Sequence, residues 1–230
     1  MCGRYAIIEG KKIFATFAML REMEKQITPS LSVPHYNAAP TDQLPIFFQS
    51  KEGLCVRDAF WWLIPQWSKT GTPDTKFASF NARAETIDTS KLFAPYFKAR
   101  RCLIPVDGFF EWKREEGKKT PMFISMDDGA PFMMAGVYSI WKNDAGEERP
   151  SFCVITTQAN GFMQSIHTRM PVILPETEFD RWLDRGFNDT SALKELLCPA
   201  PSHLMKAYAV TSRVNNSRYQ EADCVTAVTL

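Results

Sequence analysis

The chain has 230 residues, of which 45% are hydrophobic and 23% are charged, and its formal net charge at pH 7 is +1. These values are typical of a globular protein with one large domain or two small ones. A charge this small excludes a bulk attraction to nucleic acid, so any anion-binding site must come from local clusters of Arg and Lys.

Cysteine and histidine usage argues against a metal site. The six cysteines include no CxxC pair, and the three histidines form no HxxxH or HExxH pattern. The first residues lack the apolar segment of a secretory signal, and no apolar run is long enough to predict a membrane span. We therefore expect a cytoplasmic protein with reduced thiols, no metal, no cofactor and no membrane partner.

Strand patterns dominate the chain order. A short strand is predicted over residues 4–8, and a loop-rich stretch covers 29–45. Further strands are predicted over 44–49, 54–61, 103–106, 109–114, 121–126, 132–141 and 151–157. Several of them are separated by short polar segments that contain Gly117, Gly129 or Gly146, where a hairpin turn needs a positive φ.

Helical spacing of apolar residues is found between and after these strands. Helices are predicted over residues 13–26, 91–97, 159–165, 176–183 and 191–197, with Thr190 or Ser191 as the cap of the last one. Closely spaced strands with inserted helices predict an α+β fold with a mostly antiparallel sheet that closes or half-closes into a barrel. No linker or composition shift marks a boundary, so we expect a single domain over residues 1–230.

The start of the chain, Met1-Cys2-Gly3-Arg4, carries its most unusual chemistry. Removal of Met1 would leave Cys2 with an α-amine and a thiol on adjacent carbons. Such an amine condenses with an aldehyde to an imine, and the thiolate then closes a five-membered thiazolidine ring. Reference pKa values of about 7.7–8.0 for an α-amine and about 8.5 for a thiol leave usable fractions of both nucleophiles near neutral pH. Alternatively, Cys2 is a small apolar residue whose thiol does not react, and this residue alone does not distinguish between the two interpretations.

Three further segments carry polar residues that suit chemistry. Asn81, Arg83 and Glu85 would share one face of a strand, although a solvated edge strand shows the same pattern. Glu111 lies between Phe and Trp residues. The residues alone favour a position for Glu111 on the solvent face of a strand. The alternative is a carboxylic acid held beside apolar surface, which would suit it to proton transfer. His167 suits either a structural hydrogen bond or proton donation to an oxygen leaving group.

An aromatic run ends at Trp67, which follows Pro65 and lies beside Lys69. Aromatic runs are usually core. Because the proline interrupts the run, Trp67 is nevertheless the best candidate for an exposed ring that stacks on a base.

Taken together, these segments resemble the SRAP family of abasic-site processing proteins, first described as SOS-response-associated peptidases. The resemblance covers most of the chain, and its pieces occur in family order: Met1-Cys2-Gly3-Arg4, Tyr36-Asn37-Ala38-Ala39-Pro40, Ile64-Pro65-Gln66-Trp67, Asn81-Ala82-Arg83-Ala84-Glu85-Thr86, residues 101–112, and His167-Thr168-Arg169-Met170-Pro171. The tail segment 210–215 is also similar. Six segments in order make a specific match.

The resemblance implies a fold built around a barrel-like sheet, with Cys2 beneath a positively charged groove for single-stranded DNA. It implies that Cys2 captures the aldehyde of an abasic site as a thiazolidine DNA–protein cross-link that shields the lesion, with self-reversal of the cross-link and autoproteolytic loss of Met1 as further activities. The implied catalytic residues are Cys2, Asn81, Glu111 and His167. The implied DNA-binding residues are Arg4, Asn37, Pro40, Trp67, Arg83 and Arg169.

The expected partner is abasic single-stranded DNA, with replication-fork proteins as further partners of a monomer. Two departures stand out: Trp62 replaces a Gly found in many relatives, and Thr168 replaces a frequent Asp. Two other functions stay open. One is an N-terminal-nucleophile glutamine amidotransferase, which also begins Met-Cys-Gly, and the other is a non-covalent single-strand-binding module.

Overall fold

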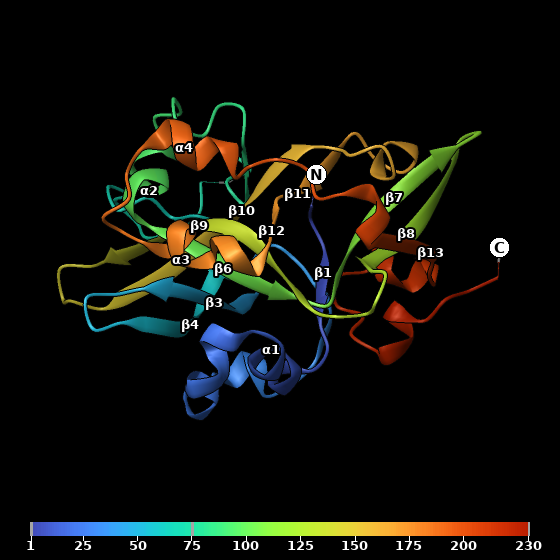
Figure 1. Ribbon diagram of the computed structural model, residues 1–230, viewed down its shortest axis with the longest axis horizontal. Coiled ribbons are helices and arrows are strands. Elements are labelled where there is room, and N and C mark those ends of the chain that lie inside the picture. The colour runs from blue at the N-terminus through green and yellow to red at the C-terminus, as the bar shows by residue number, and fades with distance from the viewer. Residues whose placement is uncertain (1, 75, 230) are drawn as a thin grey trace.

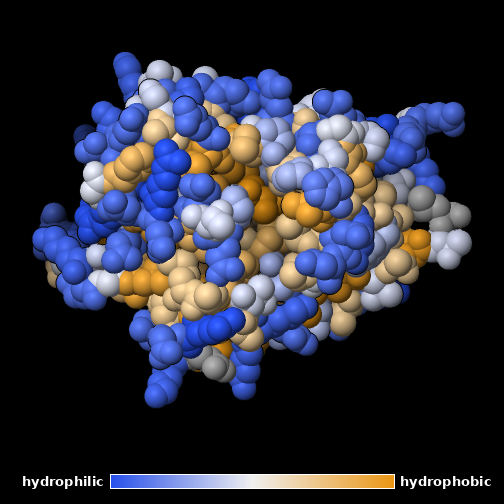
Figure 2. All heavy atoms as spheres, viewed as in Figure 1, coloured by the Kyte–Doolittle hydropathy of each residue, from blue (hydrophilic) through white to orange (hydrophobic). Residues whose placement is uncertain are grey.

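The fold is described from a computed structural model, in which residues 2–74 and 76–229 are placed. Their strands form two sheets, with the helices around them (Figure 1). The predicted α+β fold with a barrel-like, mostly antiparallel sheet and peripheral helices is confirmed. No helix in this part of the chain is long and apolar enough to cross a membrane. The face drawn in Figure 2 is hollowed near its middle, where hydrophobic residues lie between hydrophilic ones.

The larger sheet closes into a barrel. Its strand order is β11-β10-β4-β3-β6-β9-β12, and β10 also pairs with β9, which joins β10, β4, β3, β6 and β9 into a ring. Neighbours in the ring are antiparallel, except that β10 runs parallel to β4. The ring strands are β3 (Gln43–Gln49), β4 (Leu54–Trp61), β6 (Arg101–Val106), β9 (Phe132–Lys142) and β10 (Glu148–Gln158).

Short strands extend this barrel and position site residues. β5 (Asn81–Arg83) runs parallel to β10, whereas β11 (Arg169–Pro171) runs antiparallel to the same part of β10. Thr156 of β10 is the register partner of both Arg83 and Pro171. β12 (Ile173–Leu174) pairs with β9. The end of β10 therefore brings together two segments that are far apart in the sequence.

The second sheet is antiparallel and has the strand order β13-β8-β7-β1-β2. Its strands are β1 (Tyr5–Ile7), β2 (His35–Ala38), β7 (Gly108–Glu115), β8 (Lys118–Met126) and β13 (Met205–Ala209). Only Asp107 separates β6 of the barrel from β7, so the two sheets follow each other directly in the chain. Long β7 and β8 form the hairpin that projects at the right of Figure 1.

The strands of the barrel and of the long hairpin are found close to their predicted positions. β4 has the predicted bounds, and the other predicted strands are found with ends shifted by a few residues. Gly117, Gly129 and Gly146 have φ values of 81°, 71° and 84°, as their turns require. Gly117 and Gly146 lie in the turns of the hairpins β7–β8 and β9–β10, whereas the turn at Gly129 connects β8 of one sheet to β9 of the other, so the hairpin predicted at Gly129 is wrong.

Two of the helix predictions fail. The predicted helix 13–26 is instead α1 (Gly10–Thr16) followed by the 3-10 helix Ala18–Gln26, because Phe17 between them is extended, with φ −98° and ψ 121°. The predicted helix 159–165 is reduced to the 3-10 turn Met163–Ser165.

The other predicted helices are present with shifted bounds. They are α2 (Ala94–Ala99), α3 (Phe179–Leu183), which follows the 3-10 turn Glu176–Glu178, and α4 (Thr190–Glu195). The predicted cap of α4 is wrong by one position. The Asp189 carboxylate accepts hydrogen bonds from the backbone N–H groups of Ser191 and Ala192. Short 3-10 turns also lie at Pro29–Leu31, Ser202–Leu204, Ser212–Asn215 and Ala222–Val225.

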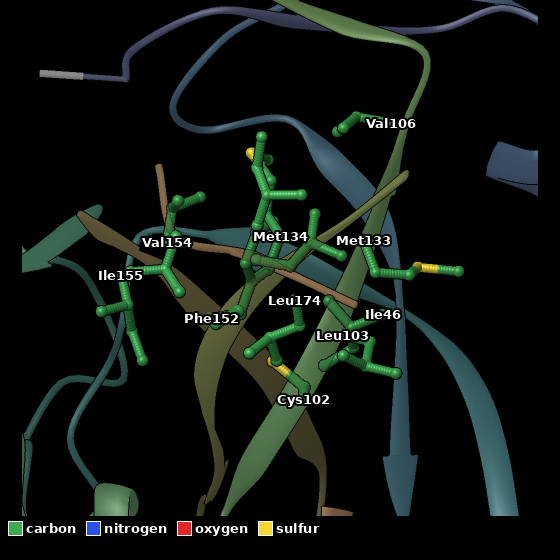
Figure 3. Close-up of a cluster of buried hydrophobic side chains, with 14 of the residues drawn as sticks. Ile46, Cys102, Leu103, Val106, Met133, Met134, Phe152, Val154, Ile155 and Leu174 are labelled. Carbon is green, nitrogen blue, oxygen red and sulfur yellow. The ribbon is translucent and has the colours of Figure 1, made fainter. Parts of the chain in front are cut away.

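Apolar side chains of the barrel strands form the main core. Figure 3 shows part of it, including Ile46, Leu103 and Phe152 from three different strands. A Cβ added to Gly136 of β9 would lie 2.6 Å from Ile104 Cδ1 and 2.8 Å from the carbonyl oxygen of Cys153. Glycine at this position therefore lets β6, β9 and β10 pack closely, which closes the barrel.

Candidate functional site

An open hollow of about 750 Å³ lies over the first residues of the chain. Its charged lining comes from three different parts of the sequence: Arg4 just before β1, Arg83 on β5, and the segment that contains His167 and Arg169. Pro40 also lies in its wall. The fold thus brings four of the predicted DNA-binding residues and the predicted catalytic histidine to one surface.

Cys2 lies directly beneath this hollow. It is fully buried, whereas the next residues, Gly3 and Arg4, line the hollow. Asn81 Nδ2 donates a hydrogen bond of 2.7 Å to the Cys2 carbonyl oxygen and so fixes the start of the chain against β5. Asn81 Oδ1 is buried and has no hydrogen-bond partner among the described residues. This oxygen can accept a hydrogen bond from a group that forms or enters beside Cys2.

The Cys2 thiol is held in its neutral form. Burial, and after it the negative charge of Glu111, raise the pKa of this thiol far above its ordinary value. The expectation of a usable thiolate fraction near neutral pH concerns Cys2 after the loss of Met1 and stays a prediction. Chemistry at this sulfur needs a base that takes the proton or a positive charge that forms nearby.

Glu111 is buried on β7, with an exposed fraction of 3%. Along this strand Phe109 and Glu111 share one face, and Phe110 has the other. Phe109 packs into the main core, while Phe110 packs into a second cluster with Val214 of the C-terminal segment. Because both faces of β7 are covered, the exposed position that the residues alone favoured for Glu111 is wrong.

His167 reaches Glu111 from the hollow. Its Nδ1 lies 3.9 Å from Glu111 Oε1, and about 30% of its side chain is exposed. The backbone N–H of Arg169 donates to the same Nδ1 at 3.0 Å. Nδ1 also lies 3.2 Å from the Arg169 carbonyl oxygen, to which a protonated Nδ1 can donate, so the contacts with Arg169 suit either neutral tautomer of the ring. Glu111 therefore has one electrostatic neighbour below, Cys2, and another above, His167.

Arg83 and Arg169 meet at the carboxylate of Glu85. Arg169 is 8% exposed, and both its terminal nitrogens donate to Glu85; the Nη2–Oε2 distance is 3.1 Å. Arg83 Nε lies 3.9 Å from Glu85 Oε2, and 65% of the Arg83 side chain is exposed. Arg83 is thus the more accessible of the two arginines. The expectation that Glu85 shares a strand face with Asn81 and Arg83 is wrong, because β5 ends at Arg83 and Glu85 lies in the following turn.

Arg4 is anchored by Asn37 and the C-terminal segment. Arg4 Nη1 donates to Asn37 Oδ1 at 2.8 Å and to the carbonyl oxygen of Val214 at 2.5 Å. Asn37 is fully buried, and its Nδ2 donates to the carbonyl oxygens of Val214, Asn216 and Tyr219. In this position Asn37 supports the wall of the hollow from behind. Its direct contact with DNA stays a prediction.

Comparison with known proteins decides the family. The model of the SRAP family, described as SOS response associated peptidase, matches residues 1–217. The chain belongs to the SRAP family.

Two named relatives and one crystal structure match this SRAP protein over nearly its whole length. The chain is 34% identical over 230 residues to the abasic site processing protein YoaM of Bacillus subtilis, and the match covers 99% of this chain and 98% of that protein. It is 30% identical over 232 residues to the abasic site processing protein YedK of Escherichia coli, with 99% and 100% covered. A crystal structure of a protein from Bacteroides thetaiotaomicron matches with a TM-score of 0.78 at 26% identity, covering 99% of this chain and 100% of that one. The resemblance seen in the sequence is confirmed.

Trp67 lies outside the hollow over Cys2, although the SRAP resemblance placed it on the DNA path. It is 74% exposed, and with Phe77, which is 64% exposed, it lines a neighbouring hollow of about 800 Å³. Asn81 lines this second hollow, and β5 therefore separates the two. The exposure expected for Trp67 is confirmed, and its stacking on a base stays a prediction.

The two departures from the SRAP pattern lie at or next to the wall of the hollow over Cys2. Trp62 packs on the ring of Phe80, with 5.1 Å between the ring centroids, and Phe80 lines the hollow. Thr168 is exposed and lines the hollow itself, and its carbonyl oxygen accepts a hydrogen bond from Ala159 N–H. Trp62 therefore acts on the wall only through Phe80.

Sequence reasoning missed the residues that hold the site together from behind. Thr156 binds Arg169 through its carbonyl oxygen at 2.7 Å and its hydroxyl at 3.1 Å. Asn215 Oδ1 accepts a hydrogen bond of 2.7 Å from Trp112 Nε1. The similar tail segment 210–215 was the one available signal for the second contact.

No group of three or more His, Cys, Asp or Glu side chains among the described residues could hold a metal ion. Met1, whose removal the chemistry requires, lies outside the described residues.

Proposed function

We propose that this SRAP protein captures abasic sites in single-stranded DNA as a covalent thiazolidine cross-link through Cys2 and so shields the lesion. Family membership and the names of the relatives support an abasic site as the target. One observation carries the chemistry: Cys2 lies under an arginine-lined hollow and within electrostatic reach of Glu111, which His167 approaches from the hollow.

The first step forms the imine. Loss of Met1, by the protein itself or by an aminopeptidase, exposes the α-amine of Cys2. His167 donates a proton to the sugar ring oxygen and favours the open aldehyde of the abasic deoxyribose. The Cys2 amine, deprotonated by Glu111, attacks C1′. Glu111 then returns this proton to the leaving hydroxyl, so that a C–N bond replaces the carbonyl C–O bond, one water leaves and a protonated imine remains.

The second step closes the ring, and the neutral thiol of Cys2 fits this order. A protonated imine places a positive charge beside the sulfur, which favours loss of the thiol proton to Glu111. The sulfur then forms a bond to C1′ while the C=N double bond becomes a single bond and the nitrogen keeps a proton. The attack is intramolecular, so no second collision is needed. Closure removes the imine that would otherwise promote strand cleavage, and the reverse steps release the DNA.

DNA binding is assigned to local charge, because the net charge of the chain is only +1. Arg83, with its exposed side chain, and Arg4 beside it contact phosphates, and the missing base leaves room for the sugar to approach Cys2. A monomeric state, a cytoplasmic location, replication-fork partners and a peptidase activity remain predictions of the family resemblance.

A denaturing gel tests the proposal directly. The protein is mixed with a labelled single strand that carries one abasic site, and with the same strand carrying a tetrahydrofuran analogue that has no aldehyde. The abasic strand gives a band that survives denaturation, whereas the analogue gives none. Equal retention of both strands, with no band after denaturation, would instead support the non-covalent binding module. Glutamine hydrolysis without a DNA adduct would support the amidotransferase.

A further inference from the structure

The β7–β8 hairpin, which projects at the right of Figure 1, carries two positive charges directly opposite each other. Arg114 of β7 is the register partner of Lys119 of β8, and both side chains are exposed. Like charges at opposed positions of a strand pair repel each other and destabilise the pair. An anion bound between Arg114 and Lys119 would relieve this repulsion.

The two opposed cations share one face of the hairpin with Trp112. Side chains alternate along a strand, so Trp112 and Arg114 point to the same side of β7. Lys119 joins them, because its Nζ lies 5.0 Å from the centre of the Trp112 ring. No Asp or Glu of the two strands, all of whose residues the structure describes, lies on this face, and neither cation forms an ion pair with a described residue. Trp112, Arg114 and Lys119 are called the basic face of the hairpin below.

The opposite face of the same hairpin carries two lysines with a carboxylate beside them. Lys113 and Glu115 share this face, and Lys113 Nζ lies 2.7 Å from Glu115 Oε1. Glu115 is also the register partner of Lys118. Glu115 therefore balances part of the positive charge here, whereas the basic face has no such group.

Trp112 connects the basic face with the hollow. Arg4, which lines the hollow, has its guanidinium carbon 5.9 Å from the centre of the Trp112 ring. The indole N–H of Trp112 donates to Asn215 Oδ1 at 2.7 Å, which fixes the ring in this place. Each residue of a strand adds about 3.4 Å, so Arg114 lies about 7 Å farther along β7 than Trp112. Positive charge therefore continues from Arg4 at the hollow to Arg114 and Lys119 near the tip of the hairpin.

We infer that the basic face binds the phosphate backbone of the single strand where it leaves the hollow on the side of Arg4. The inference rests on the proposed function, since it takes the hollow as the place of the abasic sugar. A strand with an abasic site inside it leaves the hollow in two directions, and its phosphates supply the repeated negative charge that a row of cations binds. Because the row begins at Arg4 in the hollow, the DNA strand fits it better than an acidic protein segment does.

Strand length separates the hairpin from the hollow in a binding experiment. The short probe is a strand of five nucleotides with a tetrahydrofuran analogue at its centre, and two longer probes extend it by ten nucleotides at the 5′ end or at the 3′ end. The analogue has no aldehyde, so equilibrium affinity is measured without cross-linking. With wild-type protein, one of the two extensions steepens the slope of log affinity against log salt, by roughly 0.7 for each further phosphate that is bound.

Arg114→Ala combined with Lys119→Ala removes this increment. On the longer strand that steepens the slope, the double variant lowers the slope by about 1.4, since two phosphate contacts are lost. It binds the short strand as the wild type does, which also shows that the variant is folded. The exchange Arg114→Lys with Lys119→Arg keeps the increment, because both cations remain.

Lys113→Ala combined with Lys118→Ala is the matched control. It removes the same charge from the same hairpin, but from the face that carries Glu115. It leaves the slope unchanged on all three strands. The control therefore separates a contact at the basic face from a general effect of net charge.

Equal slopes of wild type and Arg114→Ala/Lys119→Ala on both longer strands overturn the inference, and so does an equal loss in the control. A wild type whose slope neither extension changes overturns it as well and leaves an acidic protein segment as the partner of the basic face. The proposed function fails on a different observation, namely the absence of a denaturation-resistant band with the aldehyde-bearing abasic strand. In that case a slope that depends on the basic face still shows that the hairpin binds the strand.

Discussion

Free thiols are buried both in the barrel and beneath the hollow, and these two places differ in what surrounds the sulfur. Cys102 and Cys153 lie on β6 and β10 of the barrel, where burial raises the pKa of both thiols well above the ordinary value. Burial does the same at Cys2, but Cys2 also has Glu111 as an electrostatic neighbour, Asn81 on its carbonyl oxygen and an open hollow above it.

Burial by itself therefore makes a thiol inert. What distinguishes Cys2 is a carboxylate that can exchange a proton with it and a route by which an aldehyde can reach it.

The largest effect is expected from replacing the sulfur of Cys2. Cys2→Ala abolishes the stable adduct with abasic DNA, because ring closure needs sulfur as well as the amine, whereas Cys102→Ala leaves adduct formation intact. Cys2→Ser gives a labile imine that borohydride traps. A denaturing gel measures all three. A wild-type yield of adduct from Cys2→Ala would remove Cys2 from the chemistry.

Glu111→Gln tests the proton exchange. It keeps the shape of the side chain but cannot carry a proton, so both formation and release of the adduct slow by about 10²–10⁴-fold. Rates in both directions over pH 5 to 9 provide the measurement. Unchanged rates would make Glu111 structural, and slow formation with normal release would limit it to activating the amine.

Trp67 tests whether the strand also occupies the neighbouring hollow. Trp67→Ala loses about 1–3 kcal/mol of binding free energy for single-stranded DNA, because an exposed ring on which a base stacks is removed. Trp67→Phe keeps most of the affinity as the matched control. The affinity of an undamaged strand at fixed salt measures it, and equal affinities of wild type and Trp67→Ala would place Trp67 off the DNA path.

The buried thiols also predict how stability depends on pH. The folded protein keeps Cys2, Cys102 and Cys153 protonated, whereas the unfolded chain releases these protons above its thiol pKa of about 8.5. The free energy of unfolding therefore falls as the pH rises beyond that value, by about 1.4 kcal/mol per pH unit for each thiol.

Denaturant titrations at pH 7 and above pH 9 measure this slope. Replacing both Cys102 and Cys153 by Ala flattens it, whereas replacing the exposed Cys198 does not. An unfolding free energy that stays constant over this range would contradict the assignment of neutral thiols.

The smallest effect is expected for single phosphate contacts. Arg83→Ala lowers the slope of log affinity against log salt by roughly 0.7, the value for one phosphate on a single strand. Arg57→Ala, which removes an exposed arginine paired with Glu148 outside the hollow, leaves the slope unchanged. A wild-type slope in Arg83→Ala would show that this side chain is not on the phosphate path.

Local features of the fold could be read from the sequence. The strand-like run over residues 54–61 has the bounds of β4, and Gly117 and Gly146 mark the turns of two hairpins. The short motifs gave the SRAP family and, through it, the candidate residues Cys2 and His167. The helix over 13–26 failed because an extended Phe17 interrupts a periodicity that continues across it.

Long-range contacts could not be read in this way. The parallel pairing of β10 with β4, which closes the barrel, leaves no local pattern. Glu111 looks like a solvent-facing residue in the sequence, but its face of β7, which it shares with Phe109, packs against the main core, and the C-terminal segment covers the face of Phe110. The contact between Glu85 and Arg169 joins residues 84 positions apart, so it could not be read from either motif alone.

The most direct test of the central claim is the mass of the intact protein, alone and after mixing with an abasic single strand. We predict that the free protein has the mass of a chain that begins at Cys2, and that the adduct has the summed mass of protein and DNA less one water. Digestion then places the DNA on the N-terminal peptide. A protein that retains Met1 and still forms the adduct, or an adduct on any other peptide, would contradict capture by the α-amine and thiol of Cys2.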